Sequence, residues 1–338
     1  MHTRRWTYRL TLIGLLCSIL SQACLTFCLR HENTLVYGRN FDWPVGIGAV
    51  FINLPGIHKT SFVDSPTVTP LSWTSDYGSV TFNQFSKDVP VGGMNEKGLV
   101  IESLVSTAEH IPVKDREATN ELQWMQYHLD TCETVDEVIV SARKIRITRY
   151  AVDLHYFISD RLGQSAVIEF LNNRLTYKYS RTLPIKVLAN KPYDLAMKKD
   201  RENSRFGNAN NMLRNYPVED DPVDYAYRIL NKVAQGSLTK WQIVYDIKAL
   251  SIYIRTSEAP DTKTIDLNAI KFQDLTATSY ANINEAVKGD LLPHFKPYTV
   301  TFNNNLMGIS LKQLQAYGML TDLTPTQLAY IASTITNK

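Results

Sequence analysis

The sequence predicts an α+β fold in which two antiparallel sheets stack face to face between outer layers of helices, a four-layer αββα sandwich. The predicted elements run as strands, two helices, strands, two helices and strands again. Strands that do not alternate one-for-one with helices argue against a doubly wound parallel sheet. No linker rich in proline, glycine or serine divides the chain, so residues 24–338 are predicted to form a single domain behind a cleaved signal peptide at residues 1–23.

The predicted domain opens with strands. Residues 24–31 and 34–43 are predicted as a pair of strands, and Glu32-Asn33 between them makes a hairpin-like break. A third apolar strand at 48–54 is ended by Pro55-Gly56. The residues that follow, 57–92, are polar and weakly periodic, which predicts loops around short strands.

The middle of the chain changes from strand to helix. Residues 92–98 have the glycine-rich composition of a turn and lead into a predicted strand at 99–105. Apolar residues at helical spacing predict a helix at 120–129. A second helix is predicted to begin at Thr134, a suitable cap residue, and to run to about residue 144.

The rest of the chain is predicted to return to strands, then helices, then strands. The predicted strands are 154–159, 166–171, 175–179 and 185–190, the helices 206–214 and 223–235, the hairpin strands 241–247 and 250–256, and the last strand 264–267, before a largely helical tail from residue 311.

The first 23 residues have the pattern of an export signal. Three arginines form a basic n-region, and the apolar run at 10–20 is too short to span a bilayer. Ser21 and Ala23 place small residues three and one positions before Cys24, as signal peptidase requires. The pattern predicts a mature chain that begins at Cys24 and is exported, to the periplasm or as a secreted protein.

Two other signals stay open. A bacterial lipoprotein also begins with cysteine after cleavage, but its signal usually has an aliphatic residue three positions earlier, where this chain has Ser21. The run TRRW at residues 3–6 is a partial match to a twin-arginine signal.

Charge and composition narrow the class of function. Residues 1–23 hold three of the 36 basic residues and no acidic one, so 33 basic residues remain against 33 acidic residues. This balance gives no reason to expect a nucleic acid or an anionic membrane surface as partner. Hydrophobic residues make up 44% of the chain, enough for a large core, and no later apolar run is long enough to span a membrane.

The cysteines and histidines indicate neither a disulfide framework nor a metal site. Apart from the signal, the chain has Cys24, Cys28 and Cys132; the last two are interpreted as buried free thiols, although a pair between them stays open. No CxxC, HExxH or clustered histidine pattern is present, so no metal or other cofactor is expected. His155 is expected to pack in a strand.

Cleavage before Cys24 would place a thiol and a free α-amine on the same residue. The thiol is a nucleophile, and the amine, with a pKa near 8, can carry the proton close to working pH. The plain alternative is that Cys24 merely follows the signal.

Several segments in register behind Cys24 resemble the choloylglycine hydrolase family, which contains bile salt hydrolases and penicillin V acylases among the N-terminal nucleophile hydrolases. The likeness spans roughly residues 24–256. The resembling segments are YGRNFDW at 37–43, GMNEKGL at 93–99, HYFISD at 155–160, VLANKP at 187–192 and NSRF at 203–206. A spacing from Cys24 to Arg39 about one residue shorter than in the Gram-positive bile salt hydrolases, a short segment between Asn190 and Arg205, and the signal itself are typical of the exported Gram-negative-type branch.

The resemblance implies a role for each matching residue. Cys24 would be the nucleophile, Arg39 would lower the pKa of its thiol, and Asp42 would accept a hydrogen bond from the α-amine or hold the thiol. Simpler alternatives are a surface ion pair for Arg39 and a turn cap for Asp42.

Three further residues belong to the site that the resemblance implies. Asn190 would donate its side-chain amide to the oxyanion, and Arg205 would support the thiol and Asp42 electrostatically. The alternatives are a turn before Pro192 for Asn190, and an ion pair with Glu202 for Arg205. Relatives often have asparagine or tyrosine at the position of Val105, so here only the backbone N–H could contact the oxyanion as part of the substrate-binding site.

The function implied is hydrolysis of a linear amide in a small-molecule N-acyl substrate through a thioester on Cys24. The expected substrates are, in order, penicillin V, N-acyl homoserine lactones and conjugated bile salts; a homo-oligomer is left open. The alternative of another class is an exported or lipidated binding protein without activity. The aromatic residues expected either to rim an apolar acyl pocket or to pack in the core are Trp43, Phe51, Phe62, Trp73 and Tyr77.

Overall fold

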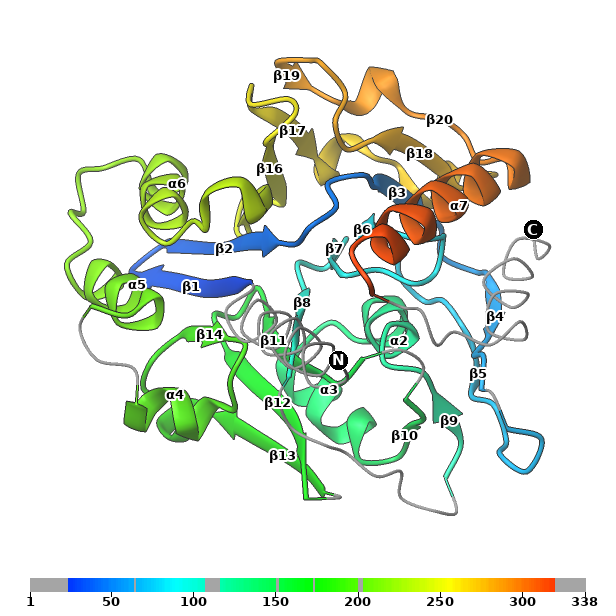
Figure 1. Cartoon of the computed structure of the whole chain (residues 1–338), viewed down its shortest axis with the longest axis horizontal. Coiled ribbons are helices and arrows are strands. Elements are labelled where there is room, and N and C mark those ends of the chain that lie inside the picture. The colour runs from blue at the N-terminus through cyan, green and yellow to red at the C-terminus, as the bar shows by residue number, and fades with distance from the viewer. Residues whose placement is uncertain are drawn as a thin grey trace, which may run out of the picture.

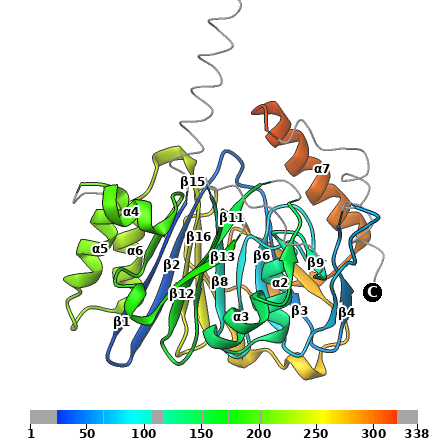
Figure 2. The same cartoon turned by 90° about the horizontal axis from the view of Figure 1, so that it is seen from below.

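The structure, a computed structural model, describes residues 24–63, 65–106, 116–149, 152–172, 174–199 and 203–319. Two large sheets stack at the centre with helices on their outer sides (Figures 1 and 2). The predicted α+β sandwich is therefore confirmed. The predicted signal peptide at 1–23 and the last part of the predicted tail, 320–338, lie outside the described residues.

The first sheet contains the N-terminal hairpin as its second and third strands. Within the described residues it has seven strands, and neighbours are antiparallel except β17 and β19, which are parallel. In sheet order the strands are β14 (Val187–Ala189), β1 (Leu25–His31), β2 (Thr34–Asp42), β15 (Thr239–Asp246), β16 (Ser251–Thr256), β17 (Lys263–Asp266) and β19 (Gly289–Asp290).

The second sheet is antiparallel throughout and, in the described part of the chain, has nine strands. In sheet order they are β13 (Arg174–Tyr179), β12 (Ser165–Leu171), β11 (Leu154–Ser159), β8 (Val100–Val105), β7 (Gly92–Asn95), β6 (Ser79–Asn83), β3 (Ala49–Asn53), β18 (Ser279–Asn282) and β20 (Lys296–Pro297). Two short pairs join β4 (His58–Thr60) to β5 (Ser72–Thr74) and β9 (Ala118–Thr119) to β10 (Arg146–Ile147).

Helices cover the outer faces of both sheets. Side chains of α4, α5 and α6 share a core with the first sheet, and those of α2 and α3 share one with the second sheet. The α-helices are α2 (Gln123–Thr131), α3 (Val135–Ala142), α4 (Tyr193–Lys199), α5 (Arg205–Arg214), α6 (Pro222–Lys232) and α7 (Val300–Ala316). Short 3-10 turns are η1 (Ser180–Thr182), η2 (Gly236–Leu238), η3 (Leu267–Ala269), η4 (Phe272–Asp274) and η5 (Leu292–His294).

Local sequence signals fix where several helices begin. The Thr134 side chain accepts from the backbone N–H of Glu137, whose own side chain reaches back to the cap, so the predicted cap of α3 is confirmed as a full capping box. Ser204 caps α5 by accepting from the N–H of Gly207. Asp221 caps α6 directly before Pro222, which suits the first helical position.

Two predicted elements differ from the structure, and one helix was missed. Residues 92–95 form strand β7 rather than a turn, because they pair with β6 and β8, and only the chain around Gly98, with φ +85°, makes the turn. The C-terminal helix begins at Val300, well before residue 311, because the Thr299 side chain caps it. Helix α4 was not predicted, since it is only seven residues long.

Candidate active site

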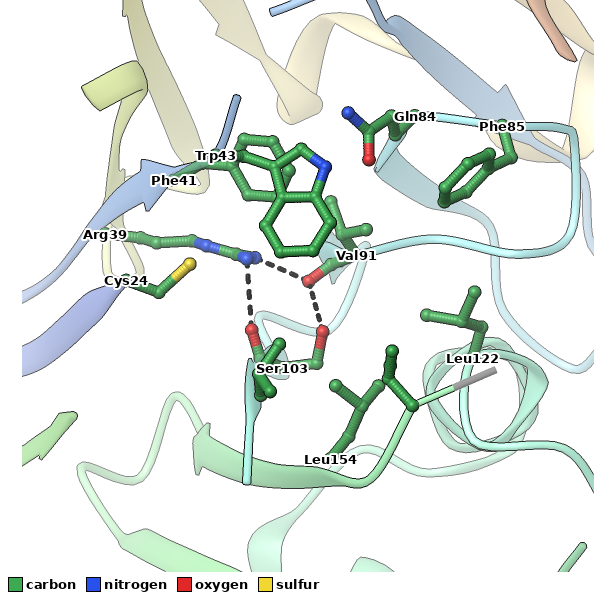
Figure 3. A pocket seen from close by; sticks show the side chains of 12 residues that line it. Cys24, Arg39, Phe41, Trp43, Gln84, Phe85, Val91, Ser103, Leu122 and Leu154 are labelled. Atoms are coloured by element: carbon green, nitrogen blue, oxygen red, sulfur yellow. Dashed lines mark hydrogen bonds between the residues drawn. The ribbon is translucent and has the colours of Figure 1, made fainter. Parts of the chain in front are cut away.

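A pocket opens between the two sheets where β1 and β2 meet the end of β8. Its floor holds Cys24 and Arg39, and its walls are almost entirely apolar (Figure 3). The lining residues are Cys24, Arg39, Phe41, Trp43, Gln84, Phe85, Val91, Ser103, Val105, Leu122, Val152 and Leu154.

Cys24 stands directly before β1 and is only 4% exposed. Its backbone has φ +53°, in the left-handed region that non-glycine residues rarely adopt. Its thiol donates a hydrogen bond to the main-chain carbonyl of Asp42, with 3.8 Å between Sγ and O. Burial raises the pKa of the Cys24 thiol, the Arg39 cation acts to lower it, and the Asp42 carboxylate acts to raise it further.

The register of the β1–β2 hairpin places Cys24 and Arg39 on one face. Thr26 pairs with Arg39 and Leu25 with Asn40, and residues two apart on a strand share a face. Cys24 and Arg39 therefore both point toward the second sheet, whereas Asn40 points toward the helices and donates to the Leu230 carbonyl.

Arg39 is held by three partners from the second sheet. Its Nη1 forms an ion pair with Glu102. The same nitrogen donates to the Val91 carbonyl at 2.5 Å, and Nη2 donates to the Ser103 carbonyl at 3.0 Å (Figure 3). The hydroxyl of Tyr245 donates to the other oxygen of Glu102. The predicted cation is thus beside the thiol, but it is paired with a fully buried anion.

Glu102 was not among the residues that the sequence singled out. A usable signal was present, because Glu102 is a lone carboxylate in the otherwise apolar strand VIESLV. Room for it comes from Gly92 on β7, where the Cβ of any other residue would overlap the Glu102 carboxylate. The buried ion pair therefore depends on this glycine as well as on its two charged members.

Asp42 lies at the end of β2, and its carboxylate faces the helical side. Nη2 of Arg205 donates to one oxygen and Oγ1 of Thr239 to the other, each at 2.5 Å. Arg205, the first residue of α5, also donates through Nε to the Val233 carbonyl at 2.6 Å. The structure thus brings Asp42 and Arg205 together, and it adds Thr239, which the sequence did not single out.

Asn190 and Val105 meet at the edge of the pocket nearest Cys24. Ala189 pairs with Leu25, so Asn190 follows β14 at the end where Cys24 precedes β1. Its Nδ2 donates to the Val105 carbonyl at 2.8 Å. The N–H of Ser106 donates to Asp153 on the β11 side, and because hydrogen-bonding directions alternate along an antiparallel strand, the N–H of Val105 faces the same edge as Asn190.

The aromatic residues expected either to rim the pocket or to pack in the core take different places. Of the five expected, only Trp43 lines the pocket. Phe51 and Trp73 belong to separate hydrophobic cores, and the Tyr77 hydroxyl donates to Glu133. The loop residue Phe85 takes a place in the wall that the sequence did not predict.

The two other cysteines that the structure describes, and His155, do not line the pocket. Cys28 and Cys132 are buried free thiols, and His155 lies in β11 against Glu169. Among the described residues, no three His, Cys, Asp or Glu side chains gather as a metal ion would need. No helix in that part of the chain is long and apolar enough to cross a membrane.

The two stacked antiparallel sheets between helices have the fold of the N-terminal nucleophile hydrolases, and Cys24 stands directly before the first strand of the N-terminal hairpin. Residues 24–200 match the family described as linear amide C–N hydrolases, choloylglycine hydrolase family. The chain belongs to this family, and it is therefore a linear amide hydrolase.

Similarity to known proteins supports this assignment. The chain is 25% identical to a penicillin V acylase from Pectobacterium atrosepticum, over 85% of this chain and 94% of that protein. Its fold is similar to that of penicillin V acylase from Agrobacterium tumefaciens, with a TM-score of 0.70, 21% identity, and coverage of 82% of this chain and 98% of the other. It is also similar to a single-substitution variant of conjugated bile acid hydrolase from Clostridium perfringens, with a TM-score of 0.63, 19% identity, and coverage of 78% and 98%.

Proposed function

We propose that the mature chain begins at Cys24 and hydrolyses N-acyl amides through a thioester on that residue. The observation that carries the proposal is the position of Cys24, which is buried at the floor of an apolar pocket beside the Arg39 guanidinium. The family match also begins at Cys24 itself. Removal of residues 1–23 would give Cys24 the free α-amine that the reaction needs.

The proposed reaction balances with water as the only other reactant. The α-amine takes the thiol proton as Sγ attacks the carbonyl carbon, and it then gives that proton to the nitrogen of the departing amine. The oxyanion formed between these steps would receive the N–H of Val105 and the side-chain amide of Asn190. Water, deprotonated by the same amine, then attacks the thioester, which releases the carboxylic acid and restores the thiol.

The pocket favours an apolar acyl group. Among the described residues that line it, Arg39 alone is charged, and its guanidinium is engaged by Glu102 and two carbonyls. The acyl half of the substrate would therefore lie against Phe41, Trp43 and Phe85, and the amine half would point outward. Penicillin V is the first candidate, with N-acyl homoserine lactones second and conjugated bile salts third.

The competing function is an exported or lipidated binding protein without activity. A lipoprotein carries its lipid on the sulfur of the N-terminal cysteine, which must then reach the membrane. The Cys24 thiol is instead enclosed and hydrogen-bonded to Asp42 within the pocket. This burial supports a free thiol and therefore an enzyme. The signal pattern supports export of that enzyme, to the periplasm or as a secreted protein.

The intact mass of the purified mature protein, combined with an assay on penicillin V, tests this proposal. We expect a mass that starts at an unmodified Cys24, release of phenoxyacetate, and a trapped acyl-enzyme of the corresponding added mass after acid quench. An acylated N-terminal cysteine, or an active protein with a different first residue, would overturn it.

A further inference from the structure

Helix α7 holds one wall of the pocket through the loop of residues 84–88. Oγ of Ser310 donates to the Gln84 carbonyl at 2.6 Å. The side-chain amide of Asn303 both accepts and donates a hydrogen bond. Its Oδ1 accepts from the N–H of Lys87 at 2.9 Å, and its Nδ2 donates to Oγ of Ser86 at 3.0 Å. One helix therefore contacts three of the five loop residues.

The polar residues that make these contacts lie in the buried face of α7. Asn303 and Ser310 are fully buried, in the same stripe as Leu306 and Leu314, while Asn304 and Asn305 are exposed on the other face. Leu306 packs against Ala49 and Phe51 of β3. A buried polar side chain costs stability unless it has a partner, so the partners of Asn303 and Ser310 fix how α7 and the loop fit together.

The loop is also held at both of its ends by other parts of the chain. Nε2 of Gln84 donates to the Val45 carbonyl at 3.2 Å, and Asp88 forms an ion pair with Lys59 at 3.1 Å. Phe85 lies between these fixed points, is half-buried, and lines the pocket (Figure 3). The residues on either side of Phe85 thus bond to other segments of the chain, while the Phe85 ring is directed to the space where an acyl group would lie.

We propose that Asn303 and Ser310 determine the selectivity for acyl size by fixing the loop that carries Phe85. This proposal rests on the proposed function, since it concerns the acyl pocket of that reaction. Helix α7 lies outside residues 24–200, the part that matches the family. The position of Phe85 in the pocket wall would therefore be set by a region beyond that match. Neither residue lines the pocket, so both are positioning residues that act through Phe85.

The physical reason is close packing. A fixed ring discriminates between acyl groups that differ by a methylene or two, because each misfit leaves a void or forces an overlap. When α7 no longer holds the loop, Phe85 can withdraw. Larger acyl groups would then gain room, and small ones would lose contact.

The test compares Asn303→Ala and Ser310→Ala with Asn304→Ala, which makes the same change on the exposed face of the same helix. The values of kcat/KM are measured for a series of N-acyl amides of one amine with acyl groups of increasing size. We expect the preference for the best acyl group over one two methylenes larger to fall roughly tenfold in Asn303→Ala. A smaller fall is expected in Ser310→Ala and none in Asn304→Ala. The change should lie mainly in KM, with alkylation of Cys24 by iodoacetamide at the wild-type rate.

Hydrogen exchange gives a second readout that needs no substrate. The amides of residues 84–88 should exchange faster in Asn303→Ala than in Asn304→Ala. Equal selectivity in these two variants, or equal exchange in the loop, would overturn the proposal. A wild-type protein that hydrolyses no acyl amide would instead overturn the proposed function, and the exchange measurement would still decide whether α7 fixes the loop.

Discussion

The guanidinium of Arg39 lies beside the Cys24 thiol (Figure 3), and it also forms a buried ion pair with Glu102. Both charged residues are almost inaccessible to solvent. The positive charge beside the Cys24 thiol is therefore partly compensated, which agrees with a thiol whose pKa burial raises in spite of the adjacent cation. The strength of Cys24 as the proposed nucleophile would depend on this balance.

Glu102→Gln should lower the pKa of the Cys24 thiol by about one unit. The substitution removes the anion but keeps the shape and an oxygen to accept from Tyr245, while the Val91 and Ser103 carbonyls still hold Arg39. An uncompensated cation favours the thiolate, so the pKa falls. The pH dependence of Cys24 alkylation, resolved by mass, measures it.

The matched control for this variant is Asp130→Asn. It also removes a buried, ion-paired carboxylate, the partner of Lys59 at 2.9 Å, but Asp130 does not line the pocket. Glu102→Gln removes the ion-pair partner of the buried Arg39, which costs about 3–5 kcal/mol in the free energy of unfolding. Asp130→Asn should cost less, because Lys59 keeps its ion pair with Asp88. Only Glu102→Gln should shift the thiol pKa; an unchanged or raised value there contradicts the balance described.

Cys24→Ser should lose activity by roughly a thousandfold or more, since a hydroxyl is a much poorer nucleophile than a thiol. Cys28→Ser is the natural comparison, because Cys28 lies on the strand that follows Cys24 and is also buried. It should keep activity with penicillin V. An active Cys24→Ser variant with a dead Cys28→Ser variant would reverse the assignment of the nucleophile.

Asn190→Ala should lower kcat by roughly a hundred- to a thousandfold, because it removes the proposed side-chain donor to the oxyanion. Val105→Ala keeps its backbone N–H, so most of kcat should remain. Both are measured at saturating substrate on protein shown to be folded by circular dichroism. If Asn190→Ala matched the wild type, its amide would serve only to brace the Val105 carbonyl.

Thr239→Val should lower the free energy of unfolding by about 1.5–3 kcal/mol, since the hydroxyl donates to the buried Asp42 carboxylate. The substitution keeps the shape of the side chain and leaves Asp42 with the Arg205 guanidinium as its side-chain donor within the described part of the chain. Chemical denaturation measures the loss. The same change at the exposed Thr60 should have little effect, and equal stability of the two variants argues against the hydrogen bond.

The sequence sufficed for the parts of the site whose geometry is local. Hairpin register is set by the alternation of two adjacent strands, so Cys24, Arg39 and Asp42 could be placed from the motif and its spacing. The capping box at Thr134 is likewise contained within four residues. These features depend on few other parts of the chain.

Features set by distant packing could not be predicted. Glu102 contacts Arg39 only because the two sheets stack, and Phe85 belongs to a loop that is bonded to α7, more than two hundred residues away in sequence. The composition of residues 92–95 favours a turn, and the ladders from β6 and β8 overrode that preference. Packing between distant parts of the chain likewise places Phe51 and Trp73 in hydrophobic cores and not in the pocket.

The hairpin of β1 and β2 also has a consequence for the order of folding. Its strands are joined by two residues, so the entropy lost on closing the loop is small, whereas Arg39 reaches Glu102 across 63 residues and Asp42 reaches Arg205 across 163. We expect φ-values to be high within this hairpin and near zero at Arg205. Cys24 and Arg39 would then be aligned early, while the thiol is still open to solvent, and they would become protected only as the second sheet docks.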